Sequence, residues 1–221
     1  MVQTADIESM AGSPAGLVIA VPKGRVLKPI AELFSQAGMP VAPLLSDDRT
    51  LVREIPQLGV RFLLLKPDDV PTYVEYGAAD LGIVGRDILM ERDYDLYCPL
   101  DLGIGRCRMM VAGKAGRPMP VNRTLRVATK FTQTANRYYL GKGEQVDVVY
   151  LQSSVEIAPL LGLADVIVDL VESGETLRQN GLSELEFICD ISSVVVANRV
   201  ALKLKRERIA PLLEALAKTG A

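Results

Sequence analysis

The sequence predicts an α/β protein built from two similar lobes. Short apolar runs alternate with amphipathic stretches along the chain, a pattern typical of α/β proteins with largely parallel sheets. Two segments, Gly77–Val84 and Gly162–Asp169, share Gly-x-Ala-Asp followed by a mostly apolar run. Ile19–Lys23 and Val127–Lys130 are both apolar runs that lead into a lysine-bearing loop. The repetition indicates two equivalent lobes, and a cleft between such lobes is a usual place for a ligand.

Nine short runs, most of them rich in Val, Ile and Leu, have the length and the flanking turn residues of β-strands. In chain order they are Leu17–Val21, Phe62–Leu65, Leu81–Val84, Met109–Ala112, Leu125–Thr129, Val146–Leu151, Val166–Asp169, Phe187–Cys189 and Val194–Ala197.

Four longer stretches place apolar residues at helical spacing. Glycine follows within two residues of the first three, and glycine at that place is a usual helix end. The helix candidates are Val26–Gln36, Val70–Tyr76, Thr134–Leu140 and a charged stretch from Lys205 to Lys218.

The order of these elements predicts how the chain divides. Residues 1–16 are polar, acidic and interrupted by Gly and Pro, so we expect a loose tail. We expect residues 17–105 together with 192–221 to form lobe I, because the C-terminal remainder would cross back onto the first half. Residues 106–191 would form lobe II.

Composition excludes several classes of protein. The 221 residues are 49% hydrophobic and 24% charged with a formal net charge of −2, which does not fit a nucleic-acid-binding surface rich in clustered Lys and Arg. The first residues lack the basic start and apolar run of a signal peptide, and no apolar run is long enough for a membrane span. The widely spaced Cys98, Cys107 and Cys189 suit reduced thiols. We therefore expect a cytoplasmic protein.

The chain contains no histidine. Imidazole cannot then act as a general base, as the partner of a nucleophile or as a metal ligand. Catalysis would have to depend on carboxylates, Lys, Arg, hydroxyl groups and metal ions brought by a substrate. Positioning and electrostatics would supply most of the rate.

The segment Asp169–Leu177 has the composition of a phosphate-binding loop. An apolar strand runs into Ser, Gly and Thr before a sequence that resembles a helix start. Glycine lets the backbone approach an anion, and hydroxyl and N–H groups donate hydrogen bonds to it. The acidic Asp169, Glu172 and Glu175 suit ribose hydroxyls or a bound cation, which points to a phosphorylated sugar.

Residues in and before this loop resemble the spaced signature of the ATP phosphoribosyltransferase family. The matching positions are Glu156, Gly162, Ala164, Ile167, Asp169, Leu170, Ser173, Gly174, Thr176 and Leu177. Further blocks that resemble the family are Lys23-Gly24-Arg25, Val70-Pro71, Gly77–Asp87 and Cys107-Arg108. A spaced pattern supported by separate blocks is far more specific than a lone glycine motif.

The resemblance implies a fold, an activity and partners. The fold is two-lobed and like that of the type II periplasmic binding proteins. The reaction joins N1 of the adenine of ATP to C1 of phosphoribosyl pyrophosphate, with Mg2+ bound to the pyrophosphate that leaves. It is the first step of histidine biosynthesis. The chain's length resembles the short form of the family, which implies a homodimer and a hetero-octamer with a regulatory subunit related to histidyl-tRNA synthetase.

The resemblance also implies roles for individual residues. Arg25 and Arg49 are the catalytic candidates, and Arg49 matches a position thought to reach the leaving pyrophosphate of a neighbouring subunit. Arg86 and Arg108 are possible contacts of ATP. No protein side chain is assigned to a metal. The remaining substrate-binding candidates are Lys23, Asp169, Glu172, Ser173, Gly174, Glu175 and Thr176.

Structural interpretations of the same residues stay open. Ser173 and its neighbours could form only a helix cap and a turn. Ser153 and Glu156 have the spacing of a capping box, which we favour for that pair, and Asp80 and Asp165 are expected to serve turns. The alternative function is a non-catalytic solute-binding or sensor module of the same fold, which normally has an export signal or a DNA-binding domain.

Overall fold

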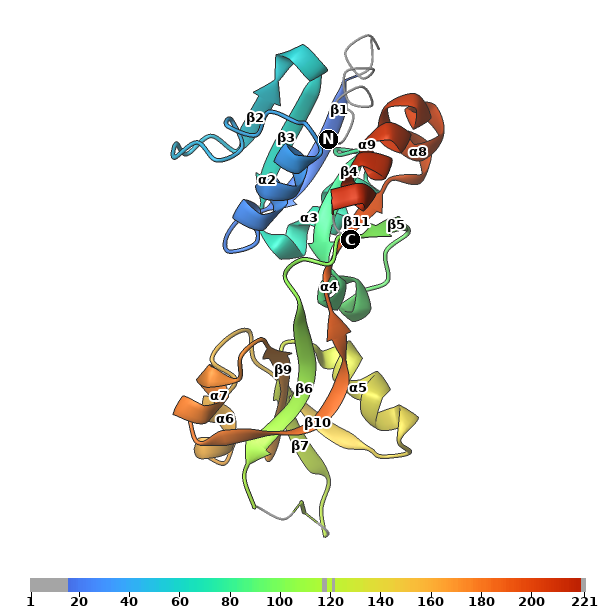
Figure 1. Ribbon diagram of the computed structural model, residues 1–221. Helices are drawn as coiled ribbons and strands as arrows, with labels where there is room; N and C mark the ends of the chain where they lie inside the picture. The colour runs from blue at the N-terminus through green and yellow to red at the C-terminus, as the bar shows by residue number, and fades with distance from the viewer. Residues whose placement is uncertain (1–15, 117–118, 121, 220–221) are drawn as a thin grey trace. The chain divides into compact units, whose positions relative to one another are not determined.

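The computed structural model describes residues 16–116, 119–120 and 122–219 (Figure 1). Contacts divide them into two compact units. The first contains the described residues up to Leu89 together with Asp93–Gly105 and those from Ser192 onward. The second contains Met90–Arg92 and Arg106–Ile191. The expected tail, residues 1–16, lies outside the described residues except for Gly16.

A six-stranded sheet forms the centre of the first unit, in the order β2-β3-β1-β4-β11-β5. Its strands are β1 (Leu17–Pro22), β2 (Val52–Ile55), β3 (Val60–Leu65), β4 (Leu81–Gly85), β5 (Tyr97–Asp101) and β11 (Ser193–Ala197). The helices of this unit are α2 (Leu27–Gln36), α3 (Val70–Glu75), α4 (Arg86–Glu91), which runs into the second unit, α8 (Arg199–Leu204) and α9 (Arg206–Thr219), with short 3-10 turns η2 (Pro56–Leu58) and η3 (Pro67–Asp69).

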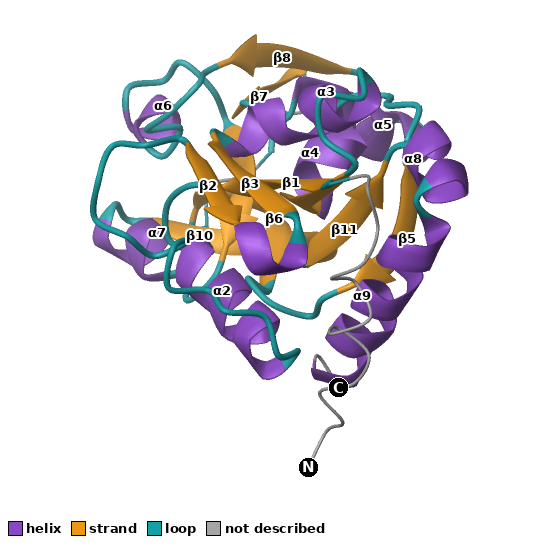
Figure 2. Cartoon of the chain, turned by 90° about the horizontal axis from the view of Figure 1, so that it is seen from above, coloured by secondary structure: helices purple, strands orange, loops and turns teal. Residues whose placement is uncertain are grey.

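Both faces of this sheet are covered. Ile19 and Val21 of β1 pack with α2 and α9, whereas Ala20 between them packs with α3, because successive side chains of a strand point to opposite faces. Figure 2 shows α2 and α9 on one side of the sheet and α3 on the other. Burial on both faces explains why β1 is an almost uninterrupted apolar run.

The second unit has a five-stranded sheet in the order β10-β6-β9-β7-β8. Its strands are β6 (Cys107–Lys114), β7 (Leu125–Thr129), β8 (Val146–Tyr150), β9 (Val166–Val171) and β10 (Leu182–Ile191), and its helices are α5 (Thr132–Gly141), α6 (Ile157–Leu160) and α7 (Glu175–Gln179). α5 packs on one face through Ala135 and Tyr139. α6 and α7 pack on the other through Ala158 and Leu177.

All nine expected strands and all four expected helices are confirmed, with shifts of a few residues at their ends. The expectation of largely parallel sheets was wrong. Among the described strands only β1–β3, β1–β4, β7–β8 and β7–β9 pair in parallel, and the other five pairings are antiparallel. A short buried apolar run has the same appearance in either kind of ladder, so the sequence pattern could not distinguish them.

Several short elements were not predicted. β2 is an edge strand in which buried Arg53 and Ile55 alternate with exposed residues, so it lacks an apolar run. β5 contains Pro99, which argues against a strand. The helices α4, α6 and α8 have six residues or fewer and show too little periodicity to be recognised.

The capping box expected for Ser153 and Glu156 was wrong. α6 begins at Ile157, and Glu156 stands at its N-cap without a side-chain capping hydrogen bond. The expected turn role of Asp80 and Asp165 is confirmed, since both are buried and both bind the backbone of a neighbouring strand.

No helix in the described part of the chain is long and apolar enough to cross a membrane.

Candidate active site

The predicted phosphate loop lies in the second unit, at the carboxyl end of β9. The strand ends at Val171, residues 172–174 form the loop, and α7 begins at Glu175. Glu172, Ser173 and Thr176 are exposed. The N–H of Glu175 donates to the Ser173 hydroxyl at 3.4 Å. The first-turn N–H groups of a helix have no intrahelical acceptors, so the start of α7 offers the kind of donors that bind anions.

Two features of this loop favour glycine at position 174. Its φ is +75°, a left-handed conformation that side chains rarely adopt. A Cβ atom at this position would also lie 3.1 Å from Oε1 of Glu184 on β10. The glycine therefore lets the loop turn tightly into α7 while it lies against the neighbouring strand.

The carboxylates of the loop have different surroundings. Asp169 lies two residues from Ile167 and two from Val171 along β9, so strand geometry places it on their face of the sheet, where α6 and α7 pack. Glu175 forms an ion pair with Arg178 and accepts a hydrogen bond from Gln179 at 2.9 Å. The Arg178 hydrogen bond is the main cause that lowers the pKa of Glu175. Glu175 is thus engaged within its own helix.

Arg108 lies close to this loop through its partner. Its Nη1 and Nη2 atoms donate to the two carboxylate oxygens of Glu184, at 2.6 and 2.9 Å. Glu184 is also the residue that a Gly174 Cβ would meet. The structure therefore brings Arg108, one of the predicted ATP contacts, next to the predicted phosphate loop.

Lys23, Gly24 and Arg25 form an exposed loop at the carboxyl end of β1. Gly24 has a φ of +102°, and its carbonyl accepts the N–H of Leu27 at 3.1 Å. The chain thus turns sharply from the strand towards α2. The carboxyl ends of parallel strands are where α/β sheets bind ligands, so the location suits the predicted role of the two basic residues.

A cavity of about 400 Å³ brings Lys23 together with Arg49. Both residues are in the first unit and are far apart in sequence. Leucines line part of the cavity, and Ser46, Thr50 and Arg53 add polar groups. A pocket with an apolar lining and several cations suits a ligand with both apolar and anionic parts.

Arg49 belongs to a loop with many side-chain hydrogen bonds. Nη1 of Arg53 donates to Oδ2 of Asp48 at 2.5 Å, and Asp48 Oδ1 accepts the N–H of Thr50 at 2.6 Å. The pKa of Asp48 lies far below its usual range, mainly because of the Arg53 hydrogen bond and then those from Thr50 and Ser46. These neighbours therefore favour the charged form of Asp48.

Arg86 follows β4 directly and pairs with Asp101, Nη2 to Oδ2, at 3.2 Å. Burial favours a higher pKa for Asp101, but hydrogen bonds from the Gly103 N–H, the Ser192 hydroxyl and Arg86 outweigh it and lower the pKa. Arg86 is half exposed and keeps donors for another ligand.

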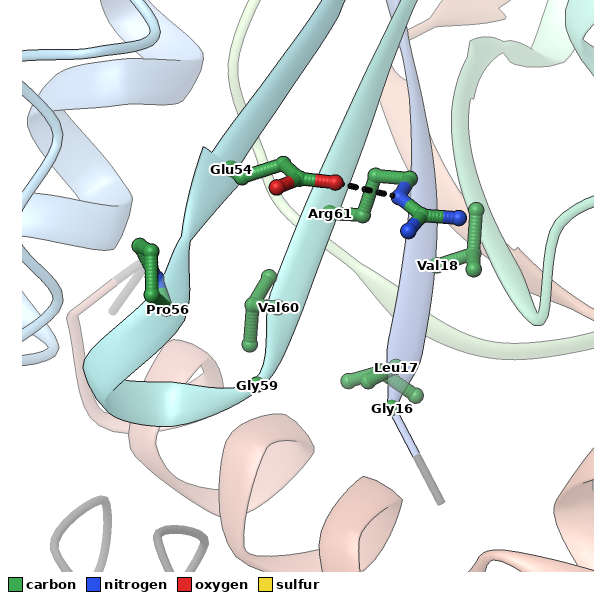
Figure 3. A pocket seen from close by; sticks show the side chains of 8 residues that line it. All are labelled: Gly16, Leu17, Val18, Glu54, Pro56, Gly59, Val60 and Arg61. Atoms are coloured by element: carbon green, nitrogen blue, oxygen red, sulfur yellow. Dashed lines mark hydrogen bonds and ion pairs between the residues drawn. The ribbon is translucent and has the colours of Figure 1, made fainter. Parts of the chain in front are cut away.

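A second cavity, of about 380 Å³, contains none of the predicted residues. It lies where β1 and β3 begin, beside Gly16 and Gly59. Figure 3 shows Glu54 and Arg61 paired across β2 and β3 at its rim, 3.0 Å apart. Ligand sites of parallel strands lie at their carboxyl ends, so we do not assign this cavity to catalysis.

Within the described residues, no group of three or more Cys, Asp and Glu side chains could hold a metal ion.

Three residues important for these loops were missed in the sequence: Asp48, Arg53 and Glu184. Asp48-Arg-Thr50 has the composition of a local turn, which was an available signal. Nothing in the sequence indicates that Glu184 binds Arg108, because the two residues are 76 positions apart.

Comparison with known proteins identifies the family. A model described as ATP phosphoribosyltransferase matches residues 66–218. A protein named ATP phosphoribosyltransferase from Sorangium cellulosum is 51% identical over 200 residues, which cover 90% of this chain and 94% of that one. The chain belongs to the ATP phosphoribosyltransferase family. The matched range includes the phosphate loop, Arg86 and Arg108, and the relative's alignment covers most of the chain.

Two further similarities agree with this family assignment. ATP phosphoribosyltransferase 2 from Geobacter sulfurreducens is 48% identical over 206 residues, 91% of this chain and 97% of that one. A solved structure titled ATP phosphoribosyl transferase (HisG:HisZ) complex from Thermotoga maritima has a TM-score of 0.80 and 35% identity, and covers 92% of this chain and 98% of that one. The expected α/β fold of the type II periplasmic-binding-protein kind is confirmed. The non-catalytic module is not favoured.

Proposed function

We propose that this chain catalyses the ATP phosphoribosyltransferase reaction and that the loop 172–174 with the start of α7 binds the 5′-phosphate of phosphoribosyl pyrophosphate. The observation that carries the proposal is the left-handed Gly174 between β9 and α7, in a chain that is 51% identical to a named ATP phosphoribosyltransferase. Ser173 and Thr176 supply hydroxyl donors. Asp169 and Glu172 are assigned to the ribose hydroxyls.

The chemistry suits a protein without histidine. Adenine N1 uses its lone pair to form a bond with C1 of the ribose, and the bond from C1 to the pyrophosphate oxygen breaks with its electrons. Neither step needs a general base. Cations must stabilise the charge that develops on the leaving group, and Arg25, Arg49 and Lys23 are assigned to this task.

Magnesium enters as an ion bound to the substrate. Among the described residues no cluster of three ligands exists, so pyrophosphate oxygens would supply most of its coordination. Asp169 and Glu172 could add a carboxylate or hold its water molecules. Such an ion would neutralise part of the charge on the leaving pyrophosphate.

The assembly and location belong to the same proposal. We infer a homodimer that joins a regulatory subunit resembling histidyl-tRNA synthetase in a hetero-octamer. The similarity to a chain from a HisG:HisZ complex supports this inference. We place the enzyme in the cytoplasm because ATP and phosphoribosyl pyrophosphate are produced and used there.

The test of the activity is direct. The purified chain is mixed with ATP, phosphoribosyl pyrophosphate and Mg2+, with and without the regulatory subunit, and the coupled nucleotide is followed by absorbance. We expect product in at least one condition, and its absence in both would overturn the proposed activity. We also infer that inhibition by histidine is relayed through the regulatory subunit. Histidine should then inhibit only when that subunit is present, and inhibition of the isolated chain would contradict this inference.

The role of Arg25 has its own test. Arg25→Ala should lower kcat by about 10- to 100-fold, since a hydrogen bond to a charged group contributes roughly 1.5–3 kcal/mol. Thermal stability should change little because Arg25 is exposed. Parallel losses of activity and stability would mean that this arginine is structural.

A further inference from the structure

One buried guanidinium binds the loop 46–50, which carries Arg49. Arg53 lies on β2 beside Ile55, on the side that faces the core, and is only 6% exposed. A buried cation is costly unless hydrogen bonds and an opposite charge compensate it. Arg53 finds these partners in the loop, where Nη2 donates to the carbonyls of Ser46 at 3.2 Å and Asp48 at 3.0 Å, in addition to the Asp48 ion pair.

Asp48 connects the two ends of the loop. One of its carboxylate oxygens accepts from Arg53 and from the hydroxyl of Ser46, the latter at 2.8 Å, and the other accepts the N–H of Thr50. Ser46, before Arg49, and Thr50, after it, are therefore held to the same carboxylate group. Arg49 thus lies in a loop closed by hydrogen bonds, with its side chain exposed.

Two of the three guanidinium nitrogens of Arg53 hold the loop. Nη1 and Nη2 make the contacts with Ser46 and Asp48, and the buried Nε atom has no hydrogen-bond partner in the described structure. Arg53 also lines the cavity that Lys23 and Arg49 share. Its guanidinium fixes a loop at the edge of this cavity.

We propose that Asp48 and Arg53 are positioning residues, which hold the loop 46–50 so that Arg49 points to the leaving pyrophosphate of a neighbouring subunit. This inference rests on the proposed function, because it needs Arg49 to act in the reaction. Small displacements of a positioned group are costly for a reaction that depends on alignment. Asp48 would act only through Arg49, without touching the substrate.

The kinetic test is a double-mutant cycle of Asp48→Ala and Arg49→Ala. Each single variant should lower kcat by roughly 10- to 100-fold with a smaller change in KM. The double variant should be no slower than Arg49→Ala alone, because the loop has no role once the arginine is gone. Asp48→Asn should recover part of the rate, since its side-chain oxygen can still accept from Thr50.

The matched control is Glu54→Ala. Glu54 lies on the same strand as Arg53 and forms an ion pair with Arg61. The side chains of Glu54 and Arg61 are exposed, and their ion pair joins two strands and does not involve the loop 46–50. Its removal should leave kcat within about twofold of the wild-type value. A similar loss in this variant would mean that any charge change on β2 slows the enzyme, which would overturn the positioning role.

A second measurement is independent of catalysis. Trypsin cleaves after Arg49, and Arg53→Met leaves the residues around that bond unchanged while it removes the three loop contacts. Cleavage after Arg49 should accelerate about tenfold as the loop opens more often. An unchanged cleavage rate in a folded variant would show that Arg53 does not hold the loop.

The outcomes separate the two proposals. If Arg49→Ala leaves kcat unchanged, its assigned role in the reaction is wrong and the positioning role falls with it. If Arg49→Ala is slow but Asp48→Ala is not, or if the two effects multiply, only the positioning role is overturned. Both proposals are supported if Asp48→Ala and Arg49→Ala each lower kcat, the double variant is no slower than Arg49→Ala, and trypsin cleaves Arg53→Met faster after Arg49.

Discussion

Asp80 and Val18 are joined by two hydrogen bonds. The N–H of Asp80 donates to the Val18 carbonyl at 2.8 Å, and the Asp80 carboxylate accepts the Val18 N–H at the same distance. In the other unit, Asp165 and Arg126 repeat the arrangement at 2.9 and 3.0 Å. The aspartate of each Gly-x-Ala-Asp turn thus ties the following strand to the start of a neighbouring parallel strand.

Removal of the Asp80 carboxylate should destabilise the first unit. Asp80→Ala leaves the Val18 N–H unpaired and takes the counterion from Lys205, 2.7 Å away. We expect the free energy of unfolding to fall by about 2–3 kcal/mol. Asp80→Asn should cost less because an oxygen acceptor remains. Urea unfolding measures both, and Asp147→Ala, which breaks an exposed pair with Arg126, should change stability by less than about 1 kcal/mol.

Gly174→Ala should impair the use of phosphoribosyl pyrophosphate. Besides the strain of a left-handed alanine, the new Cβ would lie 3.1 Å from the Glu184 carboxylate and push it aside. The control is Gly181→Ala, because Gly181 follows the same helix at a φ of +69° with no atom within 4 Å of its Cβ position. Both variants should lose about 1 kcal/mol of stability. Only Gly174→Ala should raise the KM for phosphoribosyl pyrophosphate. Equal KM values in the two variants would argue against phosphate binding by the loop 172–174.

Arg108 and Glu184 should show non-additive effects on substrate binding. Arg108→Ala leaves an unneutralised carboxylate beside the phosphate loop, where it repels an anion. We expect a higher KM for phosphoribosyl pyrophosphate in this variant. The double variant with Glu184→Ala should recover part of the loss, as steady-state kinetics at low ionic strength would reveal. If the double variant is worse than Arg108→Ala, Glu184 contributes to binding in its own right.

Glu186 should make stability depend on pH in the acidic range. Hydrogen bonds from Lys142 and from Tyr138 lower its pKa below the ordinary 4.5 and outweigh burial. A carboxyl group with a depressed folded-state pKa stabilises the protein above its unfolded pKa, and this contribution is lost as pH falls through the folded value.

The measurement is the urea midpoint between pH 7 and pH 3. Glu186→Gln should reduce the decline in stability that begins near pH 4.5. Glu54→Gln, which alters an exposed pair, should leave the decline unchanged. An identical decline in wild type and Glu186→Gln would show that other carboxylates control the acid transition.

Local patterns predicted much of this structure. Apolar runs such as Val166–Asp169 predicted strands, and the glycines that follow α2 and α3 and the one that ends α5 predicted where helices end. The loop at Gly174 could also be predicted, because the left-handed turn and the hydroxyl residues are adjacent in sequence. These features depend on interactions between residues a few positions apart.

Strand direction and charge pairing could not be predicted in the same way. β6 and β11 contain buried apolar runs like that of β1, but β1 pairs in parallel and they pair antiparallel, because the direction of a strand follows from where the chain returns to the sheet. The sequence shows the cations and carboxylates without showing which of them bind each other. Arg123 and Asp165 meet across 42 positions.

The sequence by itself determined the family signature, the alternation of strands and helices, and the phosphate loop, since each depends on residues that are close together in the chain. Only the tertiary structure decided that Glu184 neutralises Arg108 beside Gly174 and that Arg53 is buried under the loop of Arg49. The physical reason is that strand order brings distant side chains within hydrogen-bonding distance, and burial then determines which charges must be compensated.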